Sequence, residues 1–308
     1  MRVLFWGTPD FAVTPLAALL GEGLDVVGVV TQPDKPQGRS RSSVIASPVK
    51  TLAIREEIPV LQPVKARDPA FVDEISKLEP DISVVVAYGQ ILSREVIDLP
   101  RLGTLNIHAS LLPALRGAAP IQGAILAGFA ETGISIMQMV PALDAGPVLH
   151  QVKTPIGPEE TYGELAMRLS ELGALAIVEA LALMSAGATT PKEQDASLVT
   201  LAPKVARESA RIDWTEDSQQ VSRGIRAYDP RPAAFTSAGG EEVKLFHPSL
   251  AEGLSGNPGQ VLEAGDDLVV ACGTGAVRIS EVQPAGRRRM AAGDWTRGRA
   301  VAVGDILG

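Results

Sequence analysis

The chain has 308 residues, 45% of them hydrophobic, and a formal net charge of −8. This composition excludes a disordered or fibrous protein, and the length favours two globular domains over one. The single cysteine, Cys272, excludes an intrachain disulfide and a cysteine-ligated zinc site, and three histidines argue against a histidine-rich metal site. We therefore predict a protein that binds no metal and resides in a reducing compartment.

The N-terminus does not read as a signal peptide. Met1 and Arg2 lead into about four apolar residues, which is too few for the apolar region of such a peptide. No apolar run in the sequence approaches the ~20 residues of a membrane span. These features predict a soluble, cytoplasmic protein.

The first half of the chain alternates strand-like and helix-like segments. A buried strand at 2–6, helical spacing at 11–20 and a valine-rich strand at 25–31 form a βαβ opening, which is typical of parallel doubly wound sheets. Gly7 does not begin a GxGxxG motif, so a dinucleotide site is poorly supported. Further helices are predicted at 49–57, 71–78, 94–97, 160–185 and up to about 126, and further strands near 60, at 81–87, around 106–108 and at 132–139.

Two segments interrupt this alternation. Residues 32–48 are rich in Pro, Gly, Ser and Arg and predict a mobile basic loop. Residues 187–203 show no periodicity and predict a linker. Beyond the linker, short strand-like runs separated by glycine predict a small barrel or sandwich. These runs are 234–236, 243–246, 259–263, 268–272 and 277–282.

The charge is unevenly distributed. The acidic total argues against a nucleic acid partner, but residues 35–55 hold five basic and no acidic residues, and 284–300 hold five arginines and one aspartate. Two basic patches on an acidic protein can hold a polyanion at chosen places, and the alternative is that both are solvated loops. The patches contain Lys35, Arg39, Arg41, Lys50 and Arg55, and Arg287, Arg288, Arg289, Arg297 and Arg299.

Asn106 and His108 form the most informative pair in the chain. They are two residues apart, so on a strand both side chains project from the same face. The turn at 110–113 follows them, and open α/β sheets place their sites at the C-terminal ends of strands. Asp144 adds a carboxylate in the loop after the strand at 132–139. The pattern predicts one site that uses all three groups.

These three residue types suit the transfer of a one-carbon acyl group to an amine. An asparagine amide donates to an oxyanion, a histidine exchanges a proton near neutral pH, and an aspartate orients the histidine and stabilises its cation. None of the three is an obvious nucleophile, which favours direct transfer over a covalent acyl-enzyme. From the spacing alone, a hydrogen-bonded core role for His108 and turn roles for Asn106 and Asp144 remain the alternative.

A set of motifs along the whole chain narrows this interpretation. The motifs are GTPDF at 7–11, TQPD at 31–34, VAYG at 86–89, NIHASLLP at 106–113, RGAAPI at 116–121, MQM at 137–139, RIDW at 211–214, IRA at 225–227 and QPAG at 283–286. Together they resemble the methionyl-tRNA formyltransferases. The Asn-x-His pair with an aspartate is shared with the wider group of transformylases and hydrolases that use formyltetrahydrofolate.

The resemblance implies an α/β fold with a Rossmann-like, doubly wound, mostly parallel sheet of the formyltransferase type, followed by a C-terminal OB-like β-barrel. We expect a catalytic domain at 1–188, a linker at 189–206 and a tRNA-binding domain at 207–308. The resemblance also implies 10-formyltetrahydrofolate as formyl donor, the α-amino group of methionine on initiator tRNA as acceptor, and a monomer. Asn106, His108 and Asp144 match the family's catalytic residues.

The resemblance assigns the binding residues as well. Tetrahydrofolate is expected against two turns and the segment 140–144, with contacts from Tyr88, Gly89, Gln90, Ile91, Leu92, Ser110, Leu111, Leu112, Pro113 and Val140. The basic loop is expected to enter the acceptor stem of the tRNA, while the barrel holds the tRNA backbone. The expected tRNA contacts are Lys35, Arg39, Arg41, Arg287, Arg288 and Arg289.

The chain departs from the family pattern at two places. The segment SRSS at 40–43 carries fewer charges than the family usually has there, which questions the grip on the acceptor stem. Ala114 and Leu115 stand where the family usually has a basic and then an aromatic residue. A contact to tRNA or to the methionine side chain is therefore expected to be lost or supplied elsewhere.

Three other functions compete with this prediction. The first is a formyltetrahydrofolate hydrolase, or a transformylase acting on a small amine, which the C-terminal domain argues against. The second is a Rossmann-type oxidoreductase, but Val30 and Thr31 stand where such an enzyme needs an acid at the end of its second strand. The third is a non-catalytic RNA-binding module, which leaves Asn106, His108 and Asp144 unexplained.

Overall fold

The computed structural model describes residues 1–37, 43–298 and 301–308, and it divides into two compact units. The first unit comprises residues 1–117, 132–154 and 166–201, and the second comprises 118–131, 155–165 and 202–308. The second unit thus includes two segments from the middle of the chain. The reason is local packing, since helix α5 (Pro120–Leu126) lies against helix α7 (Ser218–Tyr228).

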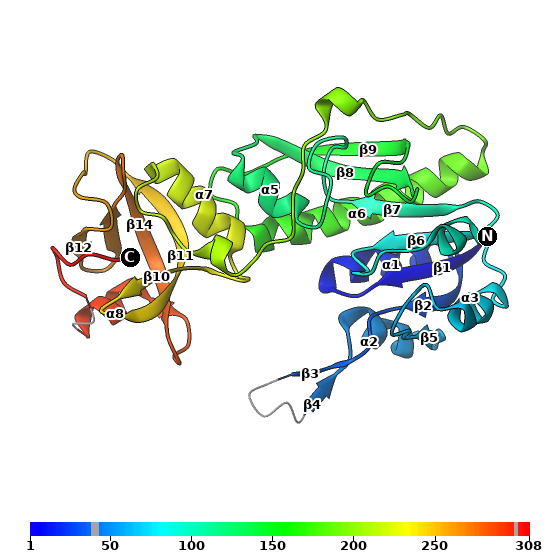
Figure 1. Ribbon diagram of the computed structural model, residues 1–308, viewed down its shortest axis with the longest axis horizontal. Coiled ribbons are helices and arrows are strands. Elements are labelled where there is room, and N and C mark those ends of the chain that lie inside the picture. Colours follow the sequence, from blue (N-terminus) through cyan, green and yellow to red (C-terminus); the bar gives the residue numbers. More distant parts are fainter. Residues whose placement is uncertain (38–42, 299–300) are drawn as a thin grey trace. The chain divides into compact units, whose positions relative to one another are not determined.

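A seven-stranded sheet forms the centre of the first unit, in the order β5-β2-β1-β6-β7-β8-β9 (Figure 1). The first five strands in this order run parallel, and β8 is antiparallel to β7. This arrangement confirms the predicted Rossmann-like, mostly parallel sheet. The strands are β1 (Arg2–Gly7), β2 (Asp25–Val30), β5 (Val60–Leu61), β6 (Ile82–Val86), β7 (Thr104–His108), β8 (Glu131–Gln138) and β9 (Val148–Pro155), of which β9 was not predicted.

Several helices of the first unit begin at a capping side chain. Ser47, Asp68 and Ser93 each accept a hydrogen bond from a backbone N–H in the first turn of the helix that follows. Such caps satisfy amides that have no partner within the helix. The helical elements are η1 (Asp10–Ala12), α1 (Val13–Gly21), α2 (Pro48–Arg55), α3 (Pro69–Ser76), α4 (Arg94–Asp98), α6 (Tyr162–Ser185) and η2 (Ala196–Leu198).

Successive side chains of β7 point alternately to the two faces of the sheet, and helices cover both faces. Ile107 faces α6, where Gly173 permits so close an approach that an added Cβ would lie 3.0 Å from Ile107 Cγ2. Thr104 faces the other way, and its hydroxyl donates to the carbonyl of Ile97 in α4. Asn106 and His108 share the parity of Thr104, so both project from the face opposite α6.

The predicted basic loop contains a short hairpin. Strands β3 (Lys35–Gln37) and β4 (Ser43–Ile45) pair antiparallel and project away from the sheet (Figure 1). Arg39 and Arg41 lie outside the described residues. At the base of the hairpin, the ammonium group of Lys50 pairs with Asp34 and lies 2.7 Å from the side-chain oxygen of Gln62. Lys50 therefore contributes to the local fold rather than to a free basic patch.

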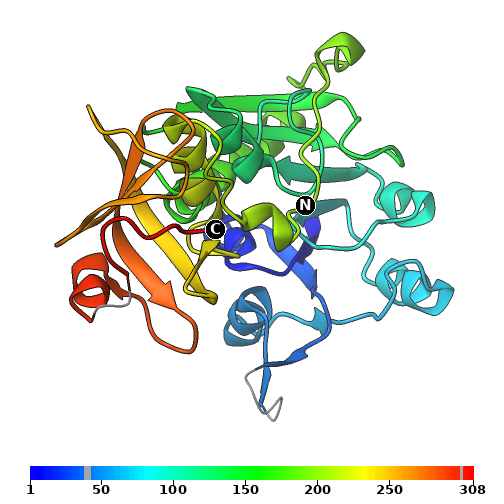
Figure 2. The same ribbon diagram turned by 60° about the vertical axis from the view of Figure 1, so that its left-hand side comes forward.

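The second unit contains an antiparallel sheet in the order β10-β11-β14-β13-β12, with β15 paired to β14 (Figure 2). The predicted set of short C-terminal strands is confirmed, although among the described residues the strand path is open and not closed into a barrel. The strands are β10 (Ala234–Ala238), β11 (Glu241–Ala251), β12 (Val261–Ala264), β13 (Leu268–Ala271), β14 (Ala276–Pro284) and β15 (Met290–Ala291). Three helical elements not predicted from the sequence are η3 (Glu208–Ala210), α7 and α8 (Ala292–Arg297).

Residues 187–201, part of the predicted linker, belong to the first unit. Lys192 forms a backbone bridge with Val148 at the start of β9, and Leu201 forms one with Arg116. Apart from the short helix η2, the segment is irregular, and these two bridges attach it to the start of β9 and to the loop at Arg116. It therefore lies where it can affect the loops around the end of β7.

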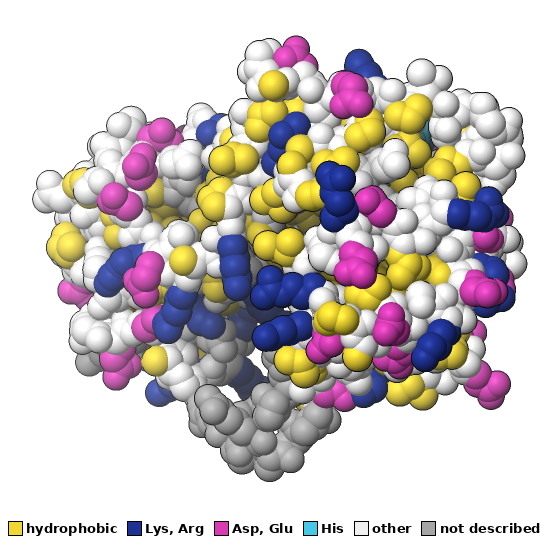
Figure 3. Space-filling model, turned by 45° about the vertical axis from the view of Figure 1, so that its right-hand side comes forward, with side chains coloured by type: hydrophobic (Ala, Val, Ile, Leu, Met, Phe, Trp, Pro, Cys, Tyr) yellow, Lys and Arg dark blue, Asp and Glu magenta, His cyan; other side chains and the backbone are white. Residues whose placement is uncertain are grey.

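Within the described ranges, no helix has the length and apolar character needed to cross a membrane. Figure 3 shows both basic and acidic side chains on the displayed face.

At Gly133, the neighbouring strands β8 and β9 lie very close together, and a substitution there tests how tightly this part of the sheet is packed. An alanine Cβ at this position would lie 2.1 Å from the Val152 carbonyl oxygen and 2.6 Å from Leu111 Cδ2. We expect Gly133→Ala to lower the free energy of unfolding by about 1–3 kcal/mol in urea titrations, since overpacking forces the neighbours to shift. Gly21→Ala is the control, because its added methyl meets no heavy atom within 4 Å beyond the backbone of its helix. Equal stability of the two variants would contradict this packing.

Candidate active site

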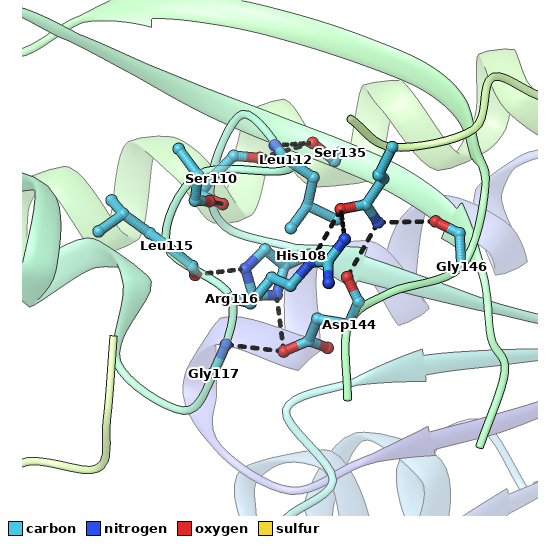
Figure 4. Close-up of polar contacts among 11 residues, drawn as sticks. His108, Ser110, Leu112, Leu115, Arg116, Gly117, Ser135, Asp144 and Gly146 are labelled. Atoms are coloured by element: carbon cyan, nitrogen blue, oxygen red, sulfur yellow. Dashed lines mark hydrogen bonds and ion pairs between the residues drawn. The ribbon is translucent and has the colours of Figure 1, made fainter. Parts of the chain in front are cut away.

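His108 lies at the C-terminal end of β7 and is buried. Its Nε2 lies 3.0 Å from the carbonyl oxygen of Leu115, and its Nδ1 lies 3.8 Å from Asp144 Oδ2 (Figure 4). Because a carbonyl can only accept, the first contact places a proton on Nε2. A neutral His108 then carries its lone pair on Nδ1, on the side of Asp144.

Burial lowers the pKa of His108, and this effect is opposed by the negative charge of Asp144 and by the hydrogen bond to Leu115. The direction favours a neutral imidazole at neutral pH. A neutral imidazole with a free Nδ1 can accept a proton, and Asp144 is close enough to stabilise the cation that results. The site thus provides a base with a built-in counter-charge.

Asp144 is held by its neighbours in an unusual backbone conformation. Its φ is +48°, and its carboxylate accepts a hydrogen bond of 2.8 Å from the Gly117 amide. The distance of 3.8 Å to His108 is too long for a hydrogen bond, so Asp144 acts on the imidazole by charge. The Leu115 carbonyl, rather than Asp144, orients the ring, which corrects the orienting role expected for the aspartate.

Asn106 lies on β7 two residues before His108, and its side chain is half-buried. Among the residues that the structure describes, its side-chain amide has no hydrogen-bond partner. Half-buried amides normally find partners, so the free amide is available to a bound molecule. Its two N–H groups are suited to an oxygen that gains negative charge.

The turn at 110–113 is fixed by buried hydrogen bonds. The Ser135 hydroxyl donates to the Ser110 carbonyl at 2.6 Å and accepts from the Leu112 amide at 3.0 Å. Gln151 donates to the Leu112 carbonyl at 2.9 Å, and the Ser110 hydroxyl donates to the Ala114 carbonyl. These partners hold the turn rigidly after His108, and they engage backbone groups of Ser110 and Leu112, two of the residues predicted to contact folate.

The other predicted folate residues divide by exposure. Tyr88 and Leu92 are buried, and burial raises the pKa of Tyr88 to about 12. Gln90 accepts from the Ala66 amide at 2.9 Å, so its side chain fixes the loop. Ile91 is 87% exposed and presents an apolar surface to solvent. In addition, Gly89 is exposed with a φ of +92°, and Leu111, Pro113 and Val140 are half-buried.

The predicted tRNA residues also differ in their surroundings. Arg287 and Arg288 are exposed in the turn between β14 and β15. Arg289 instead pairs with Glu281 and with the buried Asp229, at 3.1 Å from Asp229 Oδ1. Its guanidinium also lies 3.9 Å from the centroid of the Phe246 ring. Arg289 is thus committed to the fold of the second unit, while Lys35 lies on β3 and Arg39 and Arg41 fall outside the described residues.

Sequence reasoning missed Gln194 and Thr200, which reach the site from the predicted linker. Gln194 donates to the carbonyls of Asp144 and Gly146, and it accepts twice from the guanidinium of Arg116. Thr200 accepts from the Leu115 amide at 2.9 Å. No sequence signal marks either residue, because both lie in a segment without periodicity. Among the described residues, no cluster of three or more His, Cys, Asp or Glu side chains is arranged to hold a metal ion.

Two family models match the chain. The model described as "Formyl transferase" covers residues 1–181, and the model described as "Formyl transferase, C-terminal domain" covers residues 204–300. Curated relatives named methionyl-tRNA formyltransferase match over the full length. The protein from Stutzerimonas stutzeri is 48% identical, covering 100% of this chain and 98% of its own, and that from Magnetococcus marinus is 47% identical with the same coverage.

Solved structures show the same fold at lower identity. An N-formyltransferase from Helicobacter canadensis, in complex with folinic acid and dTDP-3-aminofucose, has a TM-score of 0.70 and 17% identity, covering 92% of this chain and 99% of its own. HypX from Aquifex aeolicus, in complex with tetrahydrofolic acid, has a TM-score of 0.65 and 22% identity, covering 96% of this chain and 46% of its own. At these identities the likeness concerns the fold alone.

The electrostatics of His108 are measurable without a substrate. In an NMR titration of the imidazole nitrogens, we expect its pKa below the ordinary value of about 6.5, because burial disfavours the cation. In Asp144→Asn we expect a further decrease, since a charge that stabilises the cation is lost. His108→Ala assigns the signal. A pKa above 6.5, or an increase in the Asp144 variant, would contradict the geometry.

Proposed function

This chain belongs to the formyl transferase family, and within it to the methionyl-tRNA formyltransferases, and from that membership we propose that it formylates initiator methionyl-tRNA. The donor is 10-formyltetrahydrofolate, the acceptor is the α-amino group of the methionine, and the product is N-formylmethionyl-tRNA for translation initiation. The observation that carries the chemistry is the amide of Asn106, without a partner among the described residues, beside a buried His108 whose charge partner is Asp144.

Each of the three side chains has a separate task in direct transfer. An α-amino group has a pKa of about 7.7, so roughly one sixth of the acceptor is neutral at pH 7 and no strong base is needed. As the amine attacks, Asn106 donates to the formyl oxygen, which becomes the oxyanion of a tetrahedral intermediate. His108 accepts the proton that the attacking nitrogen loses, through Nδ1, and Asp144 stabilises the resulting imidazolium.

The second half of the reaction returns the proton. The bond between the formyl carbon and N10 of the folate breaks, and the nitrogen that leaves needs a proton to depart as a neutral amine. The His108 cation supplies it, directly or through one water, which restores the neutral imidazole. The formyl carbon ends on the methionine nitrogen, so atoms and charge balance without an external acid.

Different sets of accessible residues are proposed to contact the folate and the tRNA. The exposed Ile91 and the turns at 88–92 and 110–113 are proposed to cover the folate ring, together with Leu111, Pro113 and Val140. Lys35, Arg39 and Arg41 are proposed to contact the acceptor stem. The C-terminal antiparallel unit is proposed to act as an OB-like platform for the tRNA backbone, which phosphate contacts position without reading sequence.

The domain limits and cellular context belong to the same proposal. We assign the catalytic domain to 1–188, the linker to 189–206 and the tRNA-binding domain to 207–308, and we expect a cytoplasmic monomer. Analytical ultracentrifugation with and without tRNA measures the oligomeric state directly. A stable dimer in the absence of tRNA would contradict this part.

The decisive experiment is a formyl transfer assay with 10-formyltetrahydrofolate and methionyl initiator tRNA. Free methionine and water compete as acceptors in parallel reactions. Formation of formylmethionyl-tRNA as the dominant product supports the proposal. Release of formate without modification of the tRNA would mean that the site chemistry is correct and the acceptor is wrong.

Single substitutions then assign the roles within the site. We expect His108→Ala to lower kcat by roughly 10²–10⁴-fold, the range for loss of a general acid–base group. Asn106→Ala is expected to lower kcat by roughly 10²–10³-fold, as for an oxyanion donor. Both variants are expected to melt within a few degrees of the wild type. If kcat stays within threefold in either variant, that residue does not have the proposed role.

The arginines of the β14–β15 turn offer a matched comparison. We expect the double substitution of Arg287 and Arg288 by alanine to raise KM for tRNA and to reduce the slope of log affinity against log salt by roughly 2, with stability unchanged. Arg289→Ala is expected to lower the melting temperature instead, because it leaves the buried carboxylate of Asp229 without its partner. A stability loss in the double variant, or unchanged melting of Arg289→Ala, would reverse the assignment.

A further inference from the structure

Gln194 uses its whole hydrogen-bonding capacity around the site. Its Nε2 donates to the carbonyl of Asp144 at 2.9 Å and to that of Gly146 at 2.7 Å. Its Oε1 accepts from Arg116 Nε at 3.0 Å and from Arg116 Nη2 at 2.7 Å. An amide has two donors and two acceptor positions, so no capacity is left over. Such complete use is typical of a residue that fixes its neighbours in place.

The loop that carries Asp144 needs this support. Its φ of +48° is costly for a residue with a side chain and persists only where the surroundings impose it. Gly146 is confined as well, since an added Cβ would lie 1.8 Å from the Gln138 carbonyl oxygen. Gln194 bonds the carbonyls on both sides of Ala145, so it fixes the peptide units that set the direction of the Asp144 carboxylate.

The same side chain connects to the other half of the catalytic pair. Arg116, its partner, stands between Leu115, which orients His108, and Gly117, which holds the Asp144 carboxylate. Gln194 therefore joins the loop of Asp144 to the segment 115–117, whose first residue, Leu115, contacts His108. The distance of 3.8 Å between the two catalytic side chains depends on both attachments.

We propose that Gln194 is a positioning residue for formyl transfer, which acts by holding Asp144 at its working distance from His108. The inference rests on the proposed function for its kinetic readout. The hydrogen bonds of Gln194 go to Arg116 and to the carbonyls of Asp144 and Gly146, so its effect passes through the backbone of the loop. Its role is therefore distinct from those of the three residues that act on the reacting atoms.

Gln194→Met is the primary test, because methionine has a similar length but neither donates nor accepts in this way. We expect kcat to fall by roughly 10- to 100-fold with KM for both substrates within about twofold, as for a small misplacement of a catalytic group. We also expect the acid limb of the kcat/KM profile to move to lower pH. A displaced Asp144 no longer raises the pKa of His108, whereas a simple loss of folded enzyme lowers the rate at every pH and leaves the limb in place.

Gln194→Glu tests the donor nitrogen and the acceptor oxygen of the Gln194 amide separately. The glutamate keeps an oxygen that accepts from Arg116. In place of the amide nitrogen that donates to the Asp144 and Gly146 carbonyls, it has a second oxygen, which repels them. We expect a kcat loss at least as large as in Gln194→Met. Glu193→Gln, an exposed neighbour, is the control and is expected to match the wild type. If Gln194→Glu keeps wild-type kcat, the contact with Arg116 is what matters, and the inference is overturned.

A titration of His108 by NMR provides a readout that needs no substrate. In Gln194→Met we expect its pKa to fall below that of the wild type, as in Asp144→Asn. If the wild type forms no formylmethionyl-tRNA while this decrease occurs, the proposed function fails and the positioning by Gln194 holds. If the wild type is active and the variant has both an unchanged His108 pKa and unchanged kcat, the positioning role is wrong.

Discussion

The site depends on the backbone of three consecutive residues, Leu115 to Gly117. The Leu115 carbonyl orients His108, and the Gly117 amide holds the Asp144 carboxylate. The amides of Leu115 and Arg116 are in turn bonded to the side chain and the carbonyl of Thr200. Buried backbone groups must find partners, and here the partners are the side chains of His108 and Asp144, the proposed catalytic residues. The geometry of the catalytic pair is therefore built into the main chain, and a side-chain change at Leu115 affects it less than a change of its backbone conformation.

Charge and hydrogen bonding are divided between different groups at His108. The imidazole receives its orientation from a neutral carbonyl and its counter-charge from a carboxylate that is bonded to the Gly117 amide. Because Asp144 shares no proton with His108, the ring is free to take up and release one at Nδ1. Burial keeps the resting imidazole neutral, and the nearby charge limits how far the pKa falls. This balance suits a base that later serves as an acid.

The sheet and the positions of the proposed catalytic side chains were predictable because their signals are local. The period-2 alternation around β7 and the apolar runs of β1 and β2 fix both the strands and the shared face of Asn106 and His108. The contribution of residues 187–201 was not predictable, since Gln194 and Thr200 bond loops that are close only in the folded chain. The same holds for Arg289, which reads as part of a basic patch but is neutralised by Asp229 and Glu281. Patterns report periodicity and charge, whereas long-range partners depend on the fold.

Two residues of the site have strained backbone conformations. Leu115 and Asp144 both have positive φ, at +61° and +48°, and each such residue costs about 1–3 kcal/mol. Both are bonded to the same irregular segment, Leu115 through Thr200 and Asp144 through Gln194. A segment with little regular structure beyond η2 can donate and accept where it is needed, and this freedom lets it stabilise two strained positions at once. Its lack of periodicity, which made it read as a linker, is thus the property that suits it to hold the site.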